Sequence, residues 1–166
     1  TRHNVLLIAD EVMTGVGRTG ANFGLDHWGV IPDLIVVGKG CSAGYTPLGA
    51  VGMRPHIKQF FMEREFVSGL TYTAHPVSLA AAIANIEVMR SDRLVERADA
   101  LGPTLHRLLN DLGEQHPSVG DVRSIGLFGI IERVRDRKSR EPLAPFNGSS
   151  PEMGALSKKL RELGLY

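Results

Sequence analysis

Two short apolar segments, each followed by an ionisable residue, constrain the fold of this chain more than any other feature. The run VLLIA, residues 5–9, is followed by Asp10, and the run LIVVG, residues 34–38, is followed by Lys39. Continuous apolar runs of this length are typical of strands that are buried on both faces of a parallel sheet. Glycines, a short amphipathic piece and an Ile-Pro-Asp turn separate the two runs, which leaves room for a crossover connection. The pattern predicts an α/β fold.

The residues that follow predict a mixed continuation. LGAVGM, residues 48–53, is a third strand candidate, and the Ala-rich segment PVSLAAAIANIEVMR predicts a helix that begins at Pro76. A second helix is expected over about residues 91–115, with Gly102-Pro103 kinking or breaking it.

Farther along, VGDVRSIGLFGIIERV predicts one or two strands, and a polar, Pro-rich loop follows. A last helix is expected from Pro151 to about Leu163, capped by Ser150 and stopped by Gly164. These elements divide the chain into residues 1–92, the C-terminal part of a large domain, and residues 93–166, part of a small α+β domain.

Composition excludes several classes of protein. The 166 residues carry a formal net charge of +1, so no strong field attracts nucleic acid or an anionic membrane. No apolar run is long enough to span a bilayer. The single cysteine, Cys41, excludes a disulfide framework, and a cytoplasmic location is expected. No metal site is predicted. The chain enters a strand after four residues and stops just after a helix, so we expect a fragment of a larger protein.

The segment GVGRTG, residues 15–20, matches the dinucleotide-binding pattern GxGxxG. That motif needs a strand directly before it and a helix directly after it. Here DEVMT separates the strand from the glycines, no long helix follows, and two acids would face the phosphates. The segment therefore favours a tight turn, with Arg18 in solvent, and a dinucleotide-dependent oxidoreductase remains a remote alternative.

Asp10 and Lys39 are the stronger candidates for chemistry. Ligands of open α/β sheets bind at the carboxyl ends of the strands, which is where both residues are expected. An amine there can form a Schiff base with a carbonyl cofactor, and a carboxylate can keep a pyridine nitrogen protonated. This pair indicates pyridoxal-phosphate chemistry; the alternative is an exposed ion pair at the sheet edge.

The segments ADEVMTGVGRTG, PDLIVVGKG, PLGAV and TYTAHPVSLAAAIANIEV, in this order, resemble the class III (ω-type) aminotransferases. The resemblance covers essentially the whole chain and is most specific up to about residue 90. It implies a fold-type-I pyridoxal-phosphate enzyme, with part of the mainly parallel sheet of the large domain and the start of the small domain.

The resemblance also implies roles for individual residues. Lys39 matches the lysine that binds pyridoxal 5'-phosphate and later moves the α-proton, and Asp10 matches the partner of the pyridinium nitrogen. Val12 matches the residue that packs on the ring. Thr71 matches the threonine that binds the cofactor phosphate in the neighbouring subunit, which implies a homodimer. Glu11 is usual in the motif, and its role is open between local structure and function.

Some positions depart from the family or lie outside its chemistry. Met13 stands where many relatives carry a glutamine that bonds the cofactor, and a thioether cannot donate that bond. Trp28 and Phe23 are expected in the core beneath the crossover. The glycine/serine phosphate cup of the family would precede residue 1 and its carboxylate-binding arginine would follow residue 166. The isolated fragment is therefore predicted to be inactive.

The resemblance predicts a transaminase that moves an amino group from an amine or ω-amino acid donor to a 2-oxo acid. Aminomutase, racemase or decarboxylase chemistry on the same core is one alternative, and a non-catalytic truncated chain is another.

Overall fold

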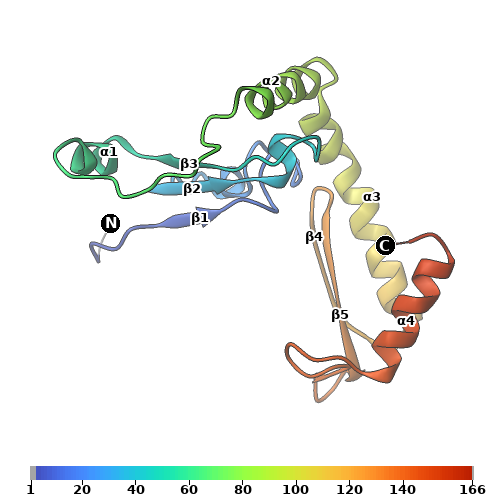
Figure 1. Ribbon diagram of the computed structural model, residues 1–166. Coiled ribbons are helices and arrows are strands. Elements are labelled where there is room, and N and C mark those ends of the chain that lie inside the picture. Colours follow the sequence, from blue (N-terminus) through green and yellow to red (C-terminus); the bar gives the residue numbers. More distant parts are fainter. Residues whose placement is uncertain (1–2, 166) are drawn as a thin grey trace. The chain divides into compact units, whose positions relative to one another are not determined.

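The computed structural model describes residues 3–165, which form two compact units (Figure 1). The first unit comprises the chain up to Gly102 together with Gly126–Phe128. The second comprises Pro103–Ile125 and the residues from Gly129 onward. Each unit has its own small sheet.

The sheet of the first unit has the order β1-β2-β3. β1 (Ile8–Asp10) runs parallel to β2 (Leu34–Val37), with Asp10 opposite Val36 in the register. β3 (Ala50–Met53) is antiparallel to β2. The connection from β1 to β2 holds Gly-rich turns and a short 3-10 helix, η1 (Gly24–Trp28). The α/β class and the parallel pairing of the first two strands are confirmed.

Three helices belong wholly or partly to this unit: α1 (Pro55–Met62), α2 (Pro76–Ser91) and the beginning of α3 (Leu94–Gln115). α1 and α2 each begin with a proline, whose fixed φ and missing N–H suit the first helical turn. The sequence pattern predicts α2 and α3, whereas α1 was not expected. A second 3-10 turn, η2 (Lys39–Cys41), follows β2 and contacts α2.

Burial on both faces of the first strand was predicted, and within this chain that prediction is wrong. Ala9 is buried, but Ile8 is 61% exposed and Val5 is 65% exposed. Among residues 3–165, β1 has one neighbouring strand and lies at the sheet edge, which leaves its other apolar side chains uncovered. Trp28 is 67% exposed, so its expected place in the core is also wrong, whereas Phe23 is half-buried.

The second unit contains the remainder of α3, a three-stranded sheet and α4 (Pro151–Glu162). The strands β4 (Val119–Ile125), β5 (Phe128–Asp136) and β6 (Glu141–Pro142) lie in that order. Val119, Val134 and Leu143 are its buried apolar residues. α4 is capped as expected: Met153 N donates to Ser150 Oγ at 3.2 Å.

α3 continues through Pro103, so the predicted break is absent. Its C-terminal end is held by a cation rather than by a glycine cap. Arg137 Nε donates to the carbonyl of Val119 at 2.7 Å, and Arg137 Nη2 donates to the carbonyls of His116, at 2.9 Å, and Gly113. A guanidinium satisfies helix-terminal carbonyls and interacts favourably with the negative end of the helix dipole. None of the helices within residues 3–165 combines the length and apolar character needed to cross a bilayer.

Candidate active site

Asp10 and Lys39 lie at the carboxyl ends of two neighbouring parallel strands, as the sequence predicted. Asp10 is the last residue of β1, and Lys39 follows the end of β2 by one glycine. Both side chains are exposed, so both are available to a ligand. Asp10 Oδ1 accepts a hydrogen bond from Val12 N at 3.0 Å, which orients the carboxylate at the end of the strand.

The chain segment after β1 packs directly against the segment after β2. A Cβ built on Gly38 would lie 3.6 Å from Val12 Cγ1, and one built on Gly40 would lie 3.0 Å from Val16 Cβ. Gly40 therefore allows Val16 to approach the lysine turn closely, whereas a Cβ on Gly38 would make only an ordinary contact with Val12. This packing brings Val12 and Lys39 to the same region of the first unit.

Lys39 itself has an uncommon backbone conformation. Its φ is +39°, in the left-handed region where a residue with a Cβ pays roughly 1–2 kcal/mol relative to right-handed conformations. Cys41 N closes the turn by donating to the carbonyl of Gly38 at 3.0 Å. Such strain persists only where surrounding contacts hold the conformation, and it is concentrated at functional sites.

Lys39 lines a cavity of about 710 Å³ in the first unit. Val12 and Asn85 line the same cavity, whereas Asp10 and Thr71 do not. Thr71 lies in an exposed turn that leads into α2. The structure thus brings Val12 and Lys39 together around one cavity, places Asp10 at the adjoining strand end, and leaves Thr71 on the surface.

Glu11, whose role was open, has a structural role in these contacts. It is 3% exposed, and its carboxylate accepts hydrogen bonds from Gly24 N at 2.8 Å, Leu25 N at 2.9 Å and the Thr14 hydroxyl. Burial raises the pKa of Glu11, but these three hydrogen bonds outweigh it and hold the pKa below its usual value. The ionised Glu11 ties the turn after β1 to the first residues of η1.

The glycines of the segment GVGRTG serve chain packing. Gly20 has a φ of +84°, and a Cβ built on it would lie 2.8 Å from Asp99 Cα in α3. Gly126, at a φ of +52°, packs so tightly on Thr19 that a Cβ there would lie 2.2 Å from its carbonyl carbon. Leu127 N donates to the carbonyl of Arg18 at 3.0 Å. These contacts explain the glycines without a bound dinucleotide.

Asn85 is a residue that the sequence analysis missed. Its Nδ2 donates to the carbonyl of Gly40 at 2.8 Å and to that of Cys41 at 3.1 Å. The available signal was an asparagine within an Ala-rich helical segment, because asparagine has a low helix propensity and needs another reason to be there.

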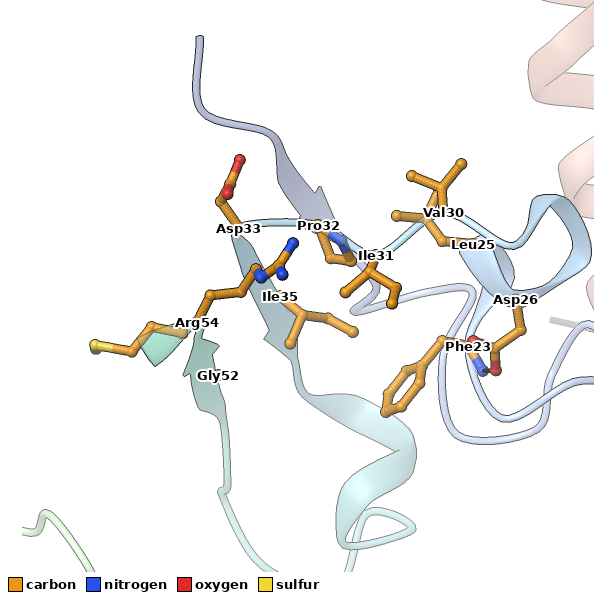
Figure 2. Close-up of a pocket in the computed structure, with 11 residues that line it drawn as sticks. Phe23, Leu25, Asp26, Val30, Ile31, Pro32, Asp33, Ile35, Gly52 and Arg54 are labelled. Carbon is orange, nitrogen blue, oxygen red and sulfur yellow. Dashed lines mark hydrogen bonds between the residues drawn. The ribbon is translucent and has the colours of Figure 1, made fainter. Parts of the chain in front are cut away.

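A second cavity, of about 330 Å³, lies beside β2 and β3 and contains none of the predicted site residues (Figure 2). Phe23, Ile31 and Ile35 give it an apolar lining. The Asp33 carboxylate points away from these side chains (Figure 2) and is held by Leu7 N at 2.8 Å. The other carboxylate of its lining, that of Asp26, accepts a hydrogen bond from Phe23 N at 2.9 Å, so both carboxylates make local backbone contacts.

An α/β sheet that presents a lysine and a carboxylate at the carboxyl ends of adjoining parallel strands has the arrangement expected of fold-type-I pyridoxal-phosphate enzymes. The family model described as Aminotransferase class-III matches residues 1–166, and the chain belongs to this family.

Curated relatives agree with the family assignment. The putrescine–pyruvate aminotransferase of Pseudomonas aeruginosa is 39% identical over 84% of this chain and 31% of its own length. The taurine–pyruvate aminotransferase of Bilophila wadsworthia is 38% identical over 86% of this chain and 33% of its own length. The chain thus spans about a third of the length of these relatives.

Solved structures give the same result. A taurine:2-oxoglutarate aminotransferase from Bifidobacterium kashiwanohense, in complex with PLP and glutamate, superposes with a TM-score of 0.92 at 33% identity. That match covers 99% of this chain and 37% of the solved one. An (S)-enantioselective omega-transaminase from Thermomicrobium roseum has a TM-score of 0.80 and 43% identity, over 87% of this chain and 33% of its own. The fold-type-I assignment is confirmed.

Proposed function

We propose that the protein containing this chain is a pyridoxal-phosphate-dependent aminotransferase that moves an amino group from an amine or ω-amino acid to a 2-oxo acid. The observation that carries the proposal is the position of Lys39 and Asp10 at the ends of adjoining parallel strands, on segments that pack against each other. Relatives named for putrescine, taurine and pyruvate support this substrate class.

The residues present fit the cofactor. Lys39 offers an exposed primary amine beside a cavity, and Asp10 offers an exposed carboxylate that is already oriented by Val12 N. Lys39 would hold the cofactor covalently, Asp10 would pair with its ring nitrogen, and Val12 would pack against the ring. When bound, pyridoxal phosphate supplies an electron sink for the charge that develops at the substrate α-carbon.

The chain's own residues then have distinct tasks. With cofactor and amino donor bound, the amine of Lys39 would act as the general base that takes the proton from the carbon bearing the donor's amino group, and then as the general acid that gives it back. Its attachment to a turn beside the site makes this transfer effectively intramolecular. Asp10, as a carboxylate, would keep the ring nitrogen protonated. The apolar Val12 side chain would exclude water from the ring.

Thr71 and the subunit arrangement belong to the same proposal. The hydroxyl of Thr71 would bind the cofactor phosphate of a neighbouring subunit, so the active protein is a homodimer. Its exposed turn before α2 suits a residue that faces a second chain. We infer a cytoplasmic enzyme without nucleic-acid or membrane partners, in keeping with the formal net charge of +1.

The test uses the product of the complete reading frame that encodes this chain. Lys39→Ala is expected to abolish both the visible absorbance of bound cofactor and its fixation by borohydride, whereas Lys58→Ala, an exposed lysine on α1, retains both. Amino transfer from putrescine or taurine to pyruvate is measured in parallel. Cofactor absorbance that survives in Lys39→Ala would overturn the proposal.

The same assay separates the alternatives. An aminomutase, racemase or decarboxylase would bind the cofactor through Lys39 but show no net transfer to a 2-oxo acid. A non-catalytic chain would show neither binding nor transfer.

A further inference from the structure

The amide of Asn85 connects α2 to the turn that carries Lys39. Its Nδ2 lies 2.8 Å from the carbonyl oxygen of Gly40 and 3.1 Å from that of Cys41. An amide nitrogen has two hydrogens, so both can be donated to these two successive carbonyls. Gly40 and Cys41 are the last two residues of η2, the turn that begins at Lys39.

The helix that provides this amide is firmly packed at that face. Ser78 and Ala82 precede Asn85 by about two turns and one turn of α2, and both are buried. Met89 Sδ lies 3.8 Å from Asn85 Nδ2 on the next turn. The amide therefore projects from an ordered helix face, not from a loop.

Local backbone hydrogen bonds close the turn that carries Lys39. Cys41 N donates to the Gly38 carbonyl at 3.0 Å and Ala43 N donates to the Gly40 carbonyl at 3.3 Å. Both Lys39 and Ala43 have a positive φ, at +39° and +49°, which residues with a Cβ rarely adopt. A conformation of this kind needs contacts from elsewhere in the chain, and the Asn85 amide supplies two.

We propose that Asn85 is a positioning residue for Lys39. It holds the carbonyls of Gly40 and Cys41 so that the turn keeps its left-handed lysine and directs the amine to one place. It acts through the backbone and does not itself touch the cofactor. This inference rests on the proposed function of Lys39.

The main test is Asn85→Asp in the product of the complete reading frame. Aspartate has the same shape but no donor, and its carboxylate would face two carbonyl oxygens. The cofactor-free readout is hydrogen exchange at the amides of Cys41 and Ala43, which we expect to become about tenfold faster from the loss of two hydrogen bonds. The rate of covalent cofactor attachment, followed after adding pyridoxal phosphate to the apoprotein, should fall by a similar factor.

Three further variants distinguish a local effect from simple misfolding. Asn85→Gln keeps both amide hydrogens and should recover part of the protection and of the attachment rate. Glu87→Gln, at an exposed position of the same helix, exchanges a carboxylate for an amide and should change neither. If Asn85→Asp does not fold, Asn85→Ser, which keeps one donor, replaces it in the same comparison.

The outcomes separate this inference from the proposed function. Wild-type exchange and wild-type attachment in folded Asn85→Asp or Asn85→Ser would overturn the role of Asn85, even where Lys39→Ala has lost the cofactor. Retention of the cofactor by Lys39→Ala would overturn the proposed function, whatever the exchange at residues 41 and 43.

Discussion

Two glycine-rich turns follow two neighbouring strands in this chain, and the two turns have different roles. The turn after β1 contains GVGRTG, and the turn after β2 contains Gly38, Lys39 and Gly40. In the first, Val16 at a φ of +59° has a left-handed backbone, as do Gly17 and Gly20, both at +84°. In the second, Lys39 has one, at a φ of +39°.

The chemistry of the side chain at the strained position separates a packing turn from a functional one. Glycine adopts a left-handed backbone without steric cost, and the strained Val16 of the first turn is an apolar residue that packs close to Gly40. A lysine in that conformation is the less stable choice, and such strain at a chemically capable residue points to function. The amine at the strained position distinguishes the second turn from the first, where the strained side chain is that of a valine.

Lys39→Gly is expected to produce the largest effect, and in opposite directions for activity and stability. Loss of the amine should lower amino transfer by more than about a thousandfold, as expected for the loss of a nucleophile and general base. Relief of the left-handed backbone should leave the free energy of unfolding equal to wild type or up to about 1 kcal/mol higher. Transaminase assays and urea denaturation measure the two. A clear loss of stability would mean that the lysine is not strained.

Gly20→Ala tests whether the first turn is limited by packing. Its Cβ would lie 2.8 Å from Asp99 Cα, at a φ of +84°. We expect the free energy of unfolding to fall by about 3 kcal/mol. The matched control is Gly29→Ala, at a φ of +60° with nothing within 4 Å of the new Cβ, which should cost only about 1 kcal/mol. Equal losses in the two variants would show that backbone conformation, and not close packing, decides the first turn.

Glu11→Gln examines what holds the first turn in place. Replacing the carboxylate oxygen that accepts from Gly24 N or Leu25 N by an amide group should cost about 2 kcal/mol of unfolding free energy at neutral pH. The pKa of Glu11 is lowered in the folded protein, so its contribution is present above the unfolded-state pKa of 4.5 and is lost as pH falls through the folded value.

Urea denaturation across this acidic range measures the effect. The difference between wild type and Glu11→Gln should shrink as the pH falls below 4.5. A difference that stays constant with pH would indicate that the charge of Glu11 does not matter to the turn.

Local signals in the sequence predicted much of this architecture. The apolar runs before Asp10 and Lys39 predicted the two parallel strands, and a serine followed by a proline located the start of α4. Local signals could not predict which apolar side chains remain exposed, or which residues far apart in the sequence come into contact. Trp28 is exposed although it is large and apolar, because nothing in the described chain covers it. Asn85 meets the lysine turn across 45 residues, a contact that only the folded chain creates.

The helix α1 was missed for a different reason. Pro55 comes shortly after the strand candidate at residues 48–53, and no helix was expected there, although a proline suits the first position of a helix, which is its place here. The roles of Lys39, Asp10, Val12 and Thr71 came from the family resemblance and stay predictions. The structure adds the packing that brings the first three to one end of the sheet.

Arg18→Ala is expected to have the smallest effect, and it tests the comparison where the two turns most resemble each other. Arg18 is the cationic residue of the first turn, as Lys39 is of the second, but its contact with Leu127 N is made by its backbone carbonyl. Because an exposed side chain is removed and that carbonyl is kept, the free energy of unfolding should change by less than about 0.5 kcal/mol. Amino transfer is measured as kcat/KM for donor and acceptor separately. Each kcat/KM should stay within about twofold of wild type, which corresponds to a change of less than about 0.5 kcal/mol in the height of the reaction barrier. A loss of kcat/KM for one substrate alone would place the guanidinium in that substrate's binding site and would give the first turn a chemical role after all.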